Sequence, residues 1–193
     1  MKLYYAPGAC SLASHIALEE NGAAYEAIKV DLKTHTTEHG ADFRAISPRG
    51  YVPAIYTGET GLLTENPAVL MYLADQGAAP PSGVDRYKML EWLGFTGTEV
   101  HNAFGPLFRG AEGADKAGAK TNVSRRLALA AELMGDAEWL VGDAPTVADN
   151  YLFVMTLWAG KLEIELPPAL VAFRERNMGR ESVRRAMAAE GLG

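Results

Sequence analysis

The sequence opens with MKLYYAPGACSLASHIALEENG, residues 1–22, and this stretch determines how the rest of the chain is organised. Residues 2–5 predict a short strand, which a tight connection links to a helix. From Ser11 apolar residues recur at helical spacing, and Asn21-Gly22 ends the helix because both residues tolerate a left-handed C-terminal cap. Cys10 therefore lies where the strand passes into the helix. Unpaired N–H groups and the helix dipole favour a thiolate there, which predicts a site residue.

The composition is that of an ordinary globular protein, with 193 residues, 48% hydrophobic and 22% charged. A formal net charge of −6 argues against a nucleic-acid partner. Apolar runs stop well short of the roughly 20 residues that a membrane span needs, and the N-terminus does not resemble a signal peptide. One cysteine cannot form an internal disulfide or the usual multi-cysteine zinc site. We therefore expect no metal and a cytoplasmic location.

The first 78 residues predict a β-α-β-α-β-β-α module that opens with a right-handed, parallel βαβ unit. Residues 31–45 are polar and leave their structure open, a short helix near 37–45 being the candidate. Glu65-Asn66-Pro67 predicts a helix start, with proline in the first turn. The strands expected after the first are residues 25–30, 54–56 and 62–64.

Residues 77–83 have the composition of a linker, and residues 85–193 beyond it predict an all-helical domain. Thr146 and Asp149 form a capping-box pattern before a strongly apolar helix. The expected helices are residues 85–108, residues 122–135 after a small-residue break at 110–118, one from Thr146, and shorter ones after Pro167 and Arg180.

Four motifs together resemble the glutathione S-transferase family over the whole length of the chain: YYAPGACSLASHIAL, ISPRGYVPAI, LLTENPAVLMYLAD and PTVADNYLF. The cysteine in GACSL and His101 in TEVHNAFGPLF resemble the bacterial beta class of that family in particular. The resemblance implies a thioredoxin-like α/β N-terminal domain with a mixed sheet, followed by an all-α domain that supplies the hydrophobic substrate site. It also implies glutathione as co-substrate and no cofactor.

The resemblance assigns glutathione-binding roles to several residues. The bond between Val52 and Pro53 is cis in the family and turns the Val52 backbone toward the ligand. Glu65 would accept a bond from the ligand's ammonium, and the N-terminus of the helix at Asn66 would hold its γ-glutamyl carboxylate. The family usually has serine at 66, and Asn66 could instead serve as a helix cap. His35 stands where the family often has lysine for the glycyl carboxylate, although a solvated histidine, or binding by Lys33 or Arg49, is an alternative.

Three residues compete to handle the glutathione sulfur: Tyr5, Cys10 and Ser11. Lowering a thiol pKa from about 8.5 to 6.5 requires roughly 2.7 kcal/mol, whereas a helix terminus supplies about 0.3–1 kcal/mol. A direct donor must supply the rest, and the beta-class resemblance implies His101 for it. The structural alternatives are an inert buried Cys10, a capping Ser11 and a His101 satisfied by a carbonyl.

Helical spacing puts Thr98, His101, Phe104 (or Gly105) and Phe108 on one face with Gly94, where beta-class relatives often have asparagine. Thr98 and His101 would contact glutathione, and Phe104, Phe108 and Trp158 would contact an apolar substrate, although an aromatic at helical spacing is also an ordinary core residue.

The resemblance implies a homodimeric enzyme that conjugates the glutathione thiolate to small hydrophobic electrophiles, a detoxification reaction. One alternative is a glutathione-dependent thiol–disulfide oxidoreductase that works through a mixed disulfide on Cys10. Another is a binding or regulatory protein without turnover.

Overall fold

The structure is a computed structural model that describes residues 1–77 and 81–193. These residues form two compact units. Unit 1 contains Met1–Pro81 together with Gly179–Gly193, and unit 2 contains Ser82–Met178. Among the described helices, none is long and apolar enough to cross a membrane.

Unit 1 is built on a mixed sheet with the strand order β3-β2-β1-β4-β5. Strands β1 and β2 are parallel, and the other neighbouring pairs are antiparallel. The central position of β1 explains its apolar sequence, because Leu3, Tyr4 and Tyr5 are all buried. The strands within the described residues are β1 (Lys2–Tyr5), β2 (Glu26–Asp31), β3 (Thr36–Thr37), β4 (Ala54–Thr57) and β5 (Gly61–Thr64).

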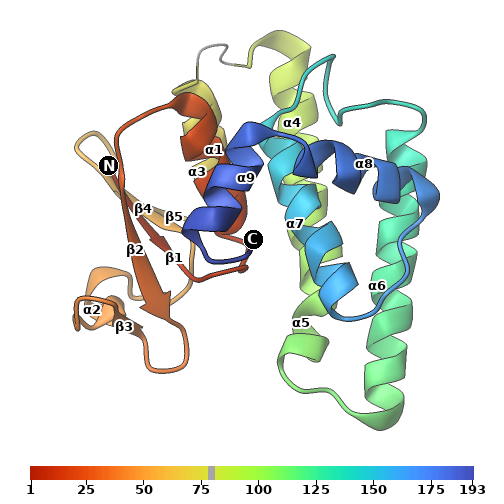
Figure 1. Cartoon of the computed structure of the whole chain (residues 1–193), viewed down its shortest axis with the longest axis horizontal. Helices are drawn as coiled ribbons and strands as arrows, with labels where there is room; N and C mark the ends of the chain where they lie inside the picture. Colours follow the sequence, from red (N-terminus) through yellow and green to blue (C-terminus); the bar gives the residue numbers. More distant parts are fainter. Residues whose placement is uncertain (78–80) are drawn as a thin grey trace. The chain divides into compact units, whose positions relative to one another are not determined.

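Helices α1 and α3 pack together in unit 1, and α9 packs against α1, as Figure 1 shows. Their bounds are α1 (Leu12–Asn21), α3 (Asn66–Asp75) and α9 (Glu181–Ala189). A short helix, α2 (Phe43–Ile46), contributes to an apolar cluster in which the rings of Phe43 and Tyr4 lie 5.4 Å apart and tilted, and Val52 is buried. Val52 thus lies at the wall of a packed core, which fixes the backbone just before β4.

Unit 2 is helical. Its most buried helix is α7, whose N-terminus carries the capping box predicted for Thr146 and Asp149. The segments are α4 (Gly83–Phe95), the π-helix η1 (Thr96–His101), α5 (Asn102–Phe108), α6 (Gly113–Met134), α7 (Val147–Lys161) and α8 (Pro168–Met178).

The predicted fold class is confirmed, with four differences in detail. The segment 31–45 contains the short strand β3 before α2, and the break expected at residues 110–118 is present but shorter, because α6 begins at Gly113. The C-terminal boundary also differs from the expected helical domain 85–193, because residues 179–193 belong to unit 1, where α9 packs on α1. The single helix expected over 85–108 is interrupted by η1. The centre of the predicted linker, 78–80, and the expected domain end at 78 lie outside the described residues.

Candidate functional site

Cys10 lies in the connection between β1 and α1, and its thiol is directed at the backbone of Val52. The Sγ–H group donates to the Val52 carbonyl oxygen at 3.3 Å. The Val52–Pro53 peptide bond is cis, as the family resemblance implied. The structure thereby brings together two stretches that the sequence separates by some forty residues, and both were expected to contact glutathione.

The protonation state of Cys10 is the opposite of the sequence-based expectation. Burial raises the pKa of the Cys10 thiol to about 12, although backbone N–H groups of Cys10 and Ser11 act in the other direction. The position at a helix N-terminus suggested a thiolate, but the dipole contributes only about 0.3–1 kcal/mol. The loss of hydration around the sulfur is larger. Cys10 is therefore a thiol, a hydrogen-bond donor, near neutral pH.

Asn66, at the start of α3, is hydrogen-bonded to the connection between β1 and α1. Its Nδ2 donates to the Cys10 carbonyl at 3.2 Å, and its Oδ1 accepts from Ser14 Oγ at 3.1 Å. Asn66 is buried, so this side chain is occupied by internal contacts. Binding of the γ-glutamyl carboxylate by the N-terminus of α3 stays a prediction.

Two cationic side chains accompany the other predicted glutathione residues. Arg49 donates to Glu65 Oε1, so the carboxylate expected to meet the ligand's ammonium is paired with an arginine in this structure. Arg44 Nη2 lies 2.9 Å from His35 Nε2. Because arginine can only donate, His35 accepts and carries its proton on Nδ1, an atom buried without a partner among the described residues. A side chain at Gly50 would lie 3.1 Å from that atom.

Arg44 was missed in the sequence because the signal for it is weak. It stands nine residues after His35 on a four-residue helix, and periodicity cannot be read over so short an element. For the lysine alternative, the structure shows the backbone N–H of Lys33 donating to Asp31 Oδ1 at 2.8 Å.

Ser11 and Tyr5 have structural contacts in unit 1. Ser11 is fully buried, and its Oγ accepts from the Ala6 N–H at 3.2 Å and lies 3.3 Å from the Ala6 carbonyl. The expected use of Ser11 as a side-chain helix cap is wrong for this reason. Burial raises the pKa of the Tyr5 hydroxyl, and repulsion from the Glu190 carboxylate raises it further.

His101 lies in unit 2 within an aromatic cluster of five side chains. Tyr151 Oη is 2.7 Å from His101 Nδ1, and the Trp158 ring meets the imidazole edge-on at 4.9 Å. Burial lowers the pKa of His101, so the imidazole is neutral near pH 7. The aromatic cluster consists of His101, Phe104, Phe108, Tyr151 and Trp158.

The π-helix η1 changes the face that the sequence predicted. A π-helical turn adds a residue to the repeat, so positions before and after it no longer align at 3.6-residue spacing. Thr98 is exposed and donates to the Gly94 carbonyl at 2.9 Å, whereas Phe104 is fully buried. The expectation of one face shared by Thr98 and Phe104 is wrong, while Phe104, Phe108 and Trp158 do lie together.

Comparisons with known proteins agree with this architecture. Residues 8–76 match the family model for the glutathione S-transferase N-terminal domain, and residues 95–181 match that for its C-terminal domain. Glutathione S-transferase GstA of Escherichia coli O157:H7 is 41% identical over the full length of both chains.

Solved structures give the same result. A sphingomonad glutathione S-transferase complexed with glutathione is 44% identical, with a TM-score of 0.94 and complete coverage of both chains. The bacterial beta-class glutathione S-transferase of Sphingomonas chungbukensis is 43% identical, also over both full chains, with a TM-score of 0.91. The chain belongs to the glutathione S-transferase family. Its resemblance to the bacterial beta class is confirmed.

Proposed function

We propose that the chain conjugates glutathione to small hydrophobic electrophiles and that unit 1 binds the glutathione. The single observation that carries this proposal is the bond from Cys10 Sγ–H to the Val52 carbonyl. It joins a thiol donor to the backbone that would pair with the extended tripeptide. The N-terminus of α3 is tied to the same point through Asn66.

In the proposed reaction Cys10 acts as a donor and not as a nucleophile. The Val52 carbonyl would accept from the cysteinyl N–H of glutathione, and the Cys10 Sγ–H would turn to the glutathione sulfur and stabilise its thiolate. That thiolate attacks the electrophilic carbon, a C–S bond forms, and the leaving group departs with its bonding electrons. The thiol proton of glutathione passes to solvent.

The burial of Cys10 disfavours the alternative of disulfide exchange through this residue. A thiolate is the reactive species in such exchange, and burial raises the pKa of Cys10 to about 12. At pH 7 the thiolate would be a fraction of about 10⁻⁵, which makes nucleophilic attack by Cys10 slow.

The glycyl carboxylate is the part of glutathione that needs a cation. We propose that Arg44 supplies the charge and that His35 orients it, because Arg44 donates to His35 Nε2. A guanidinium beside a histidine would replace the lysine that the family often uses at this place.

For the electrophile we propose the aromatic cluster of unit 2. Phe108 is 50% exposed and packs on Trp158 at 4.7 Å, so it presents an aromatic surface to an apolar substrate. A role for His101 at the sulfur stays a prediction.

A homodimer is proposed from helix α4. Val84, Tyr87 and Leu90 follow each other at spacings of three residues and are 71%, 72% and 42% exposed. Such an apolar stripe is costly to leave in water, and a second copy of the chain would cover it. Tyr87→Glu should yield monomers in analytical ultracentrifugation, and a wild type that is monomeric at micromolar concentration would contradict this proposal. We also propose the cytoplasmic location that the sequence predicted.

The test of the function compares two assays on one preparation. Initial rates of conjugation to 1-chloro-2,4-dinitrobenzene should exceed the uncatalysed rate, while glutathione-dependent reduction of a small disulfide should be slow. Disulfide reduction without conjugation would overturn the proposal in favour of the alternative. Failure to bind glutathione in calorimetry would instead favour a protein without turnover.

A further inference from the structure

Glu190, at the C-terminal end of α9, places a carboxylate in the interior of unit 1. The residue is 6% exposed and its side chain is fully buried. Oε1 lies 2.9 Å from His15 Nδ1 on α1, and Oε2 accepts the Gly8 N–H at 2.8 Å. A buried carboxylate is costly unless it is hydrogen-bonded. These two donors therefore define where the carboxylate of Glu190 can lie.

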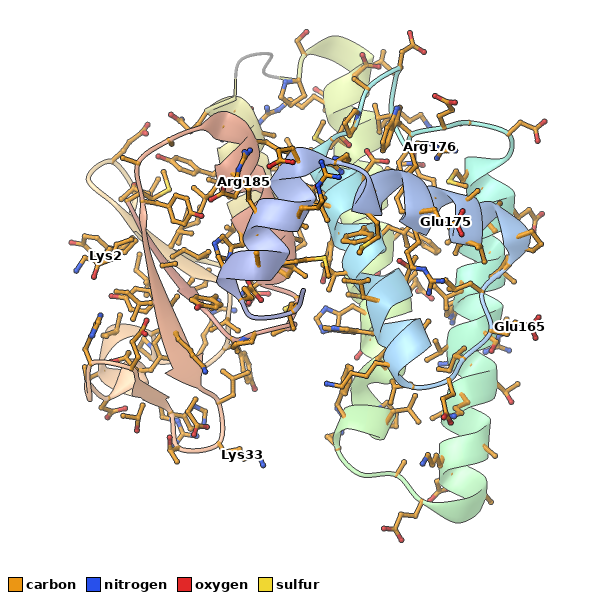
Figure 2. All side chains as sticks on the ribbon, in the orientation of Figure 1. Lys2, Lys33, Glu165, Glu175, Arg176 and Arg185 are labelled. Atoms are coloured by element: carbon orange, nitrogen blue, oxygen red, sulfur yellow. The ribbon has the colours of Figure 1, made fainter. Side chains whose placement is uncertain are left out.

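An ion pair also joins helix α9 to α1 at a second place, which provides a control for the contact made by Glu190. Arg185, labelled in Figure 2, extends from α9 and donates through Nε to Glu19 Oε2 at 2.7 Å. Arg185 is half exposed, and it contacts the carboxylates of Glu19 and Glu181 and the Glu19 carbonyl. This ion pair joins the two helices without involving Gly8, whereas Glu190 joins three segments.

The segment that Glu190 holds is the connection that carries Cys10. Gly8 is two residues before Cys10 and has a φ of +69°, a conformation that other residues rarely adopt. The Leu192 side chain lies 3.5 Å from the point where a Cβ of Gly8 would be. The C-terminal residues thus contact the connection through both a hydrogen bond and an apolar side chain, and fix the backbone on which the Cys10 thiol stands.

We propose that Glu190, held in place by His15, is a positioning residue for Cys10: its bond to Gly8 keeps the connection in the conformation that directs the thiol at the Val52 carbonyl. The role of this geometry in catalysis rests on the proposed function. The positioning itself does not, because it can be measured on the single cysteine of the chain without any turnover.

The experiment compares Glu190→Ala, Glu190→Gln and Arg185→Ala in the full-length chain. Three quantities are measured for each: stability in urea, the rate of Cys10 labelling by iodoacetamide in the folded protein, and the glutathione Kd by calorimetry. Glu190→Ala should raise the labelling rate at least tenfold and weaken glutathione binding. Glu190→Gln keeps an oxygen acceptor for Gly8 and should stay within about threefold of the wild type. Arg185→Ala should lower stability but leave the labelling rate and the glutathione Kd unchanged.

Two results would overturn the proposal. One is wild-type labelling and binding in Glu190→Ala; the other is an equal increase in labelling for Arg185→Ala, which would mean that docking of α9 matters and Gly8 does not. If Glu190→Ala does not fold, Glu190→Asp, which withdraws the carboxylate by one methylene, is judged by the same criteria. If the wild type does not conjugate glutathione but Glu190→Ala changes the labelling of Cys10 as expected, the proposed function is refuted and the positioning role of Glu190 stands.

Discussion

The raised pKa of Cys10 predicts how slowly this thiol reacts in the folded protein. Burial raises the pKa from an ordinary value of 9.0 to about 12. At pH 8 the thiolate fraction is then about 10⁻⁴, compared with about one tenth for an unperturbed thiol. Since the thiolate is the species that iodoacetamide alkylates, Cys10 should react about a thousandfold more slowly than the same cysteine in the urea-unfolded chain.

The assay is alkylation by iodoacetamide followed by mass spectrometry, from pH 7 to pH 10.5. The folded chain should show a rate that rises tenfold per pH unit over the whole range, because pH stays below the pKa. The unfolded chain should level off above about pH 9.

The shape of the pH profile separates protonation from simple shielding. A shielded thiol of ordinary pKa would react slowly at every pH but would still level off near pH 9. A plateau below pH 9 in the folded chain, or a rate within tenfold of the unfolded chain at pH 8, would refute the reasoning and restore disulfide exchange through Cys10 as the better function.

Four further predictions follow from contacts in the two units. Arg44→Ala should raise the Kd for glutathione about tenfold, through loss of a charge-assisted contact, but leave γ-glutamylcysteine, which lacks the glycyl carboxylate, unchanged in calorimetry. Asn66→Ala removes bonds to the Cys10 carbonyl and from α1, and should lower the free energy of unfolding by about 1–3 kcal/mol in urea titrations, with weaker glutathione binding. Thr146→Ala loses a capping bond and should cost about 1 kcal/mol in the same titrations, an unchanged midpoint being the contrary result. Burial raises the pKa of Asp149 to about 6, so as the pH falls the folded chain binds a proton at a higher pH than the unfolded chain does. The wild type should therefore gain about 1 kcal/mol of stability relative to Asp149→Asn from pH 7 to pH 5, and a relative loss would contradict the shift.

The N-terminal fold could be predicted because its signals are local. The apolar strand at residues 2–5 and the turn residues Asn21-Gly22 are each determined by neighbouring residues, and α1 indeed has Gly22 at its C-cap with a φ of 61°. Thr146 and Asp149 likewise form the predicted capping box within one helical turn.

The parts that could not be predicted depend on contacts between distant residues or on the balance between opposing energies, such as desolvation and the field of a helix terminus. The state of Cys10 is set by desolvation, which a sequence pattern does not report and which exceeds the local effect of the helix terminus. The π-helix that ends at His101 has a hydrogen-bond repeat one residue longer than that of an α-helix, so a face predicted from 3.6-residue spacing was misaligned. Helix α9 joins unit 1 through Glu190, about 180 residues away from its partner Gly8.

The central claim is that Cys10 serves the reaction as a protonated donor, and the conjugation rates of Cys10→Ser and Cys10→Ala test it most directly. Serine keeps a donor of similar position and cannot form a disulfide, whereas alanine removes the donor. With glutathione and 1-chloro-2,4-dinitrobenzene, we predict that Cys10→Ser stays within about tenfold of the wild type and that Cys10→Ala falls about 10- to 100-fold, the cost of one hydrogen bond to a charged group. Equal loss of activity to the uncatalysed rate in both variants would contradict the account, because it would mean that the sulfur of Cys10 itself does the chemistry.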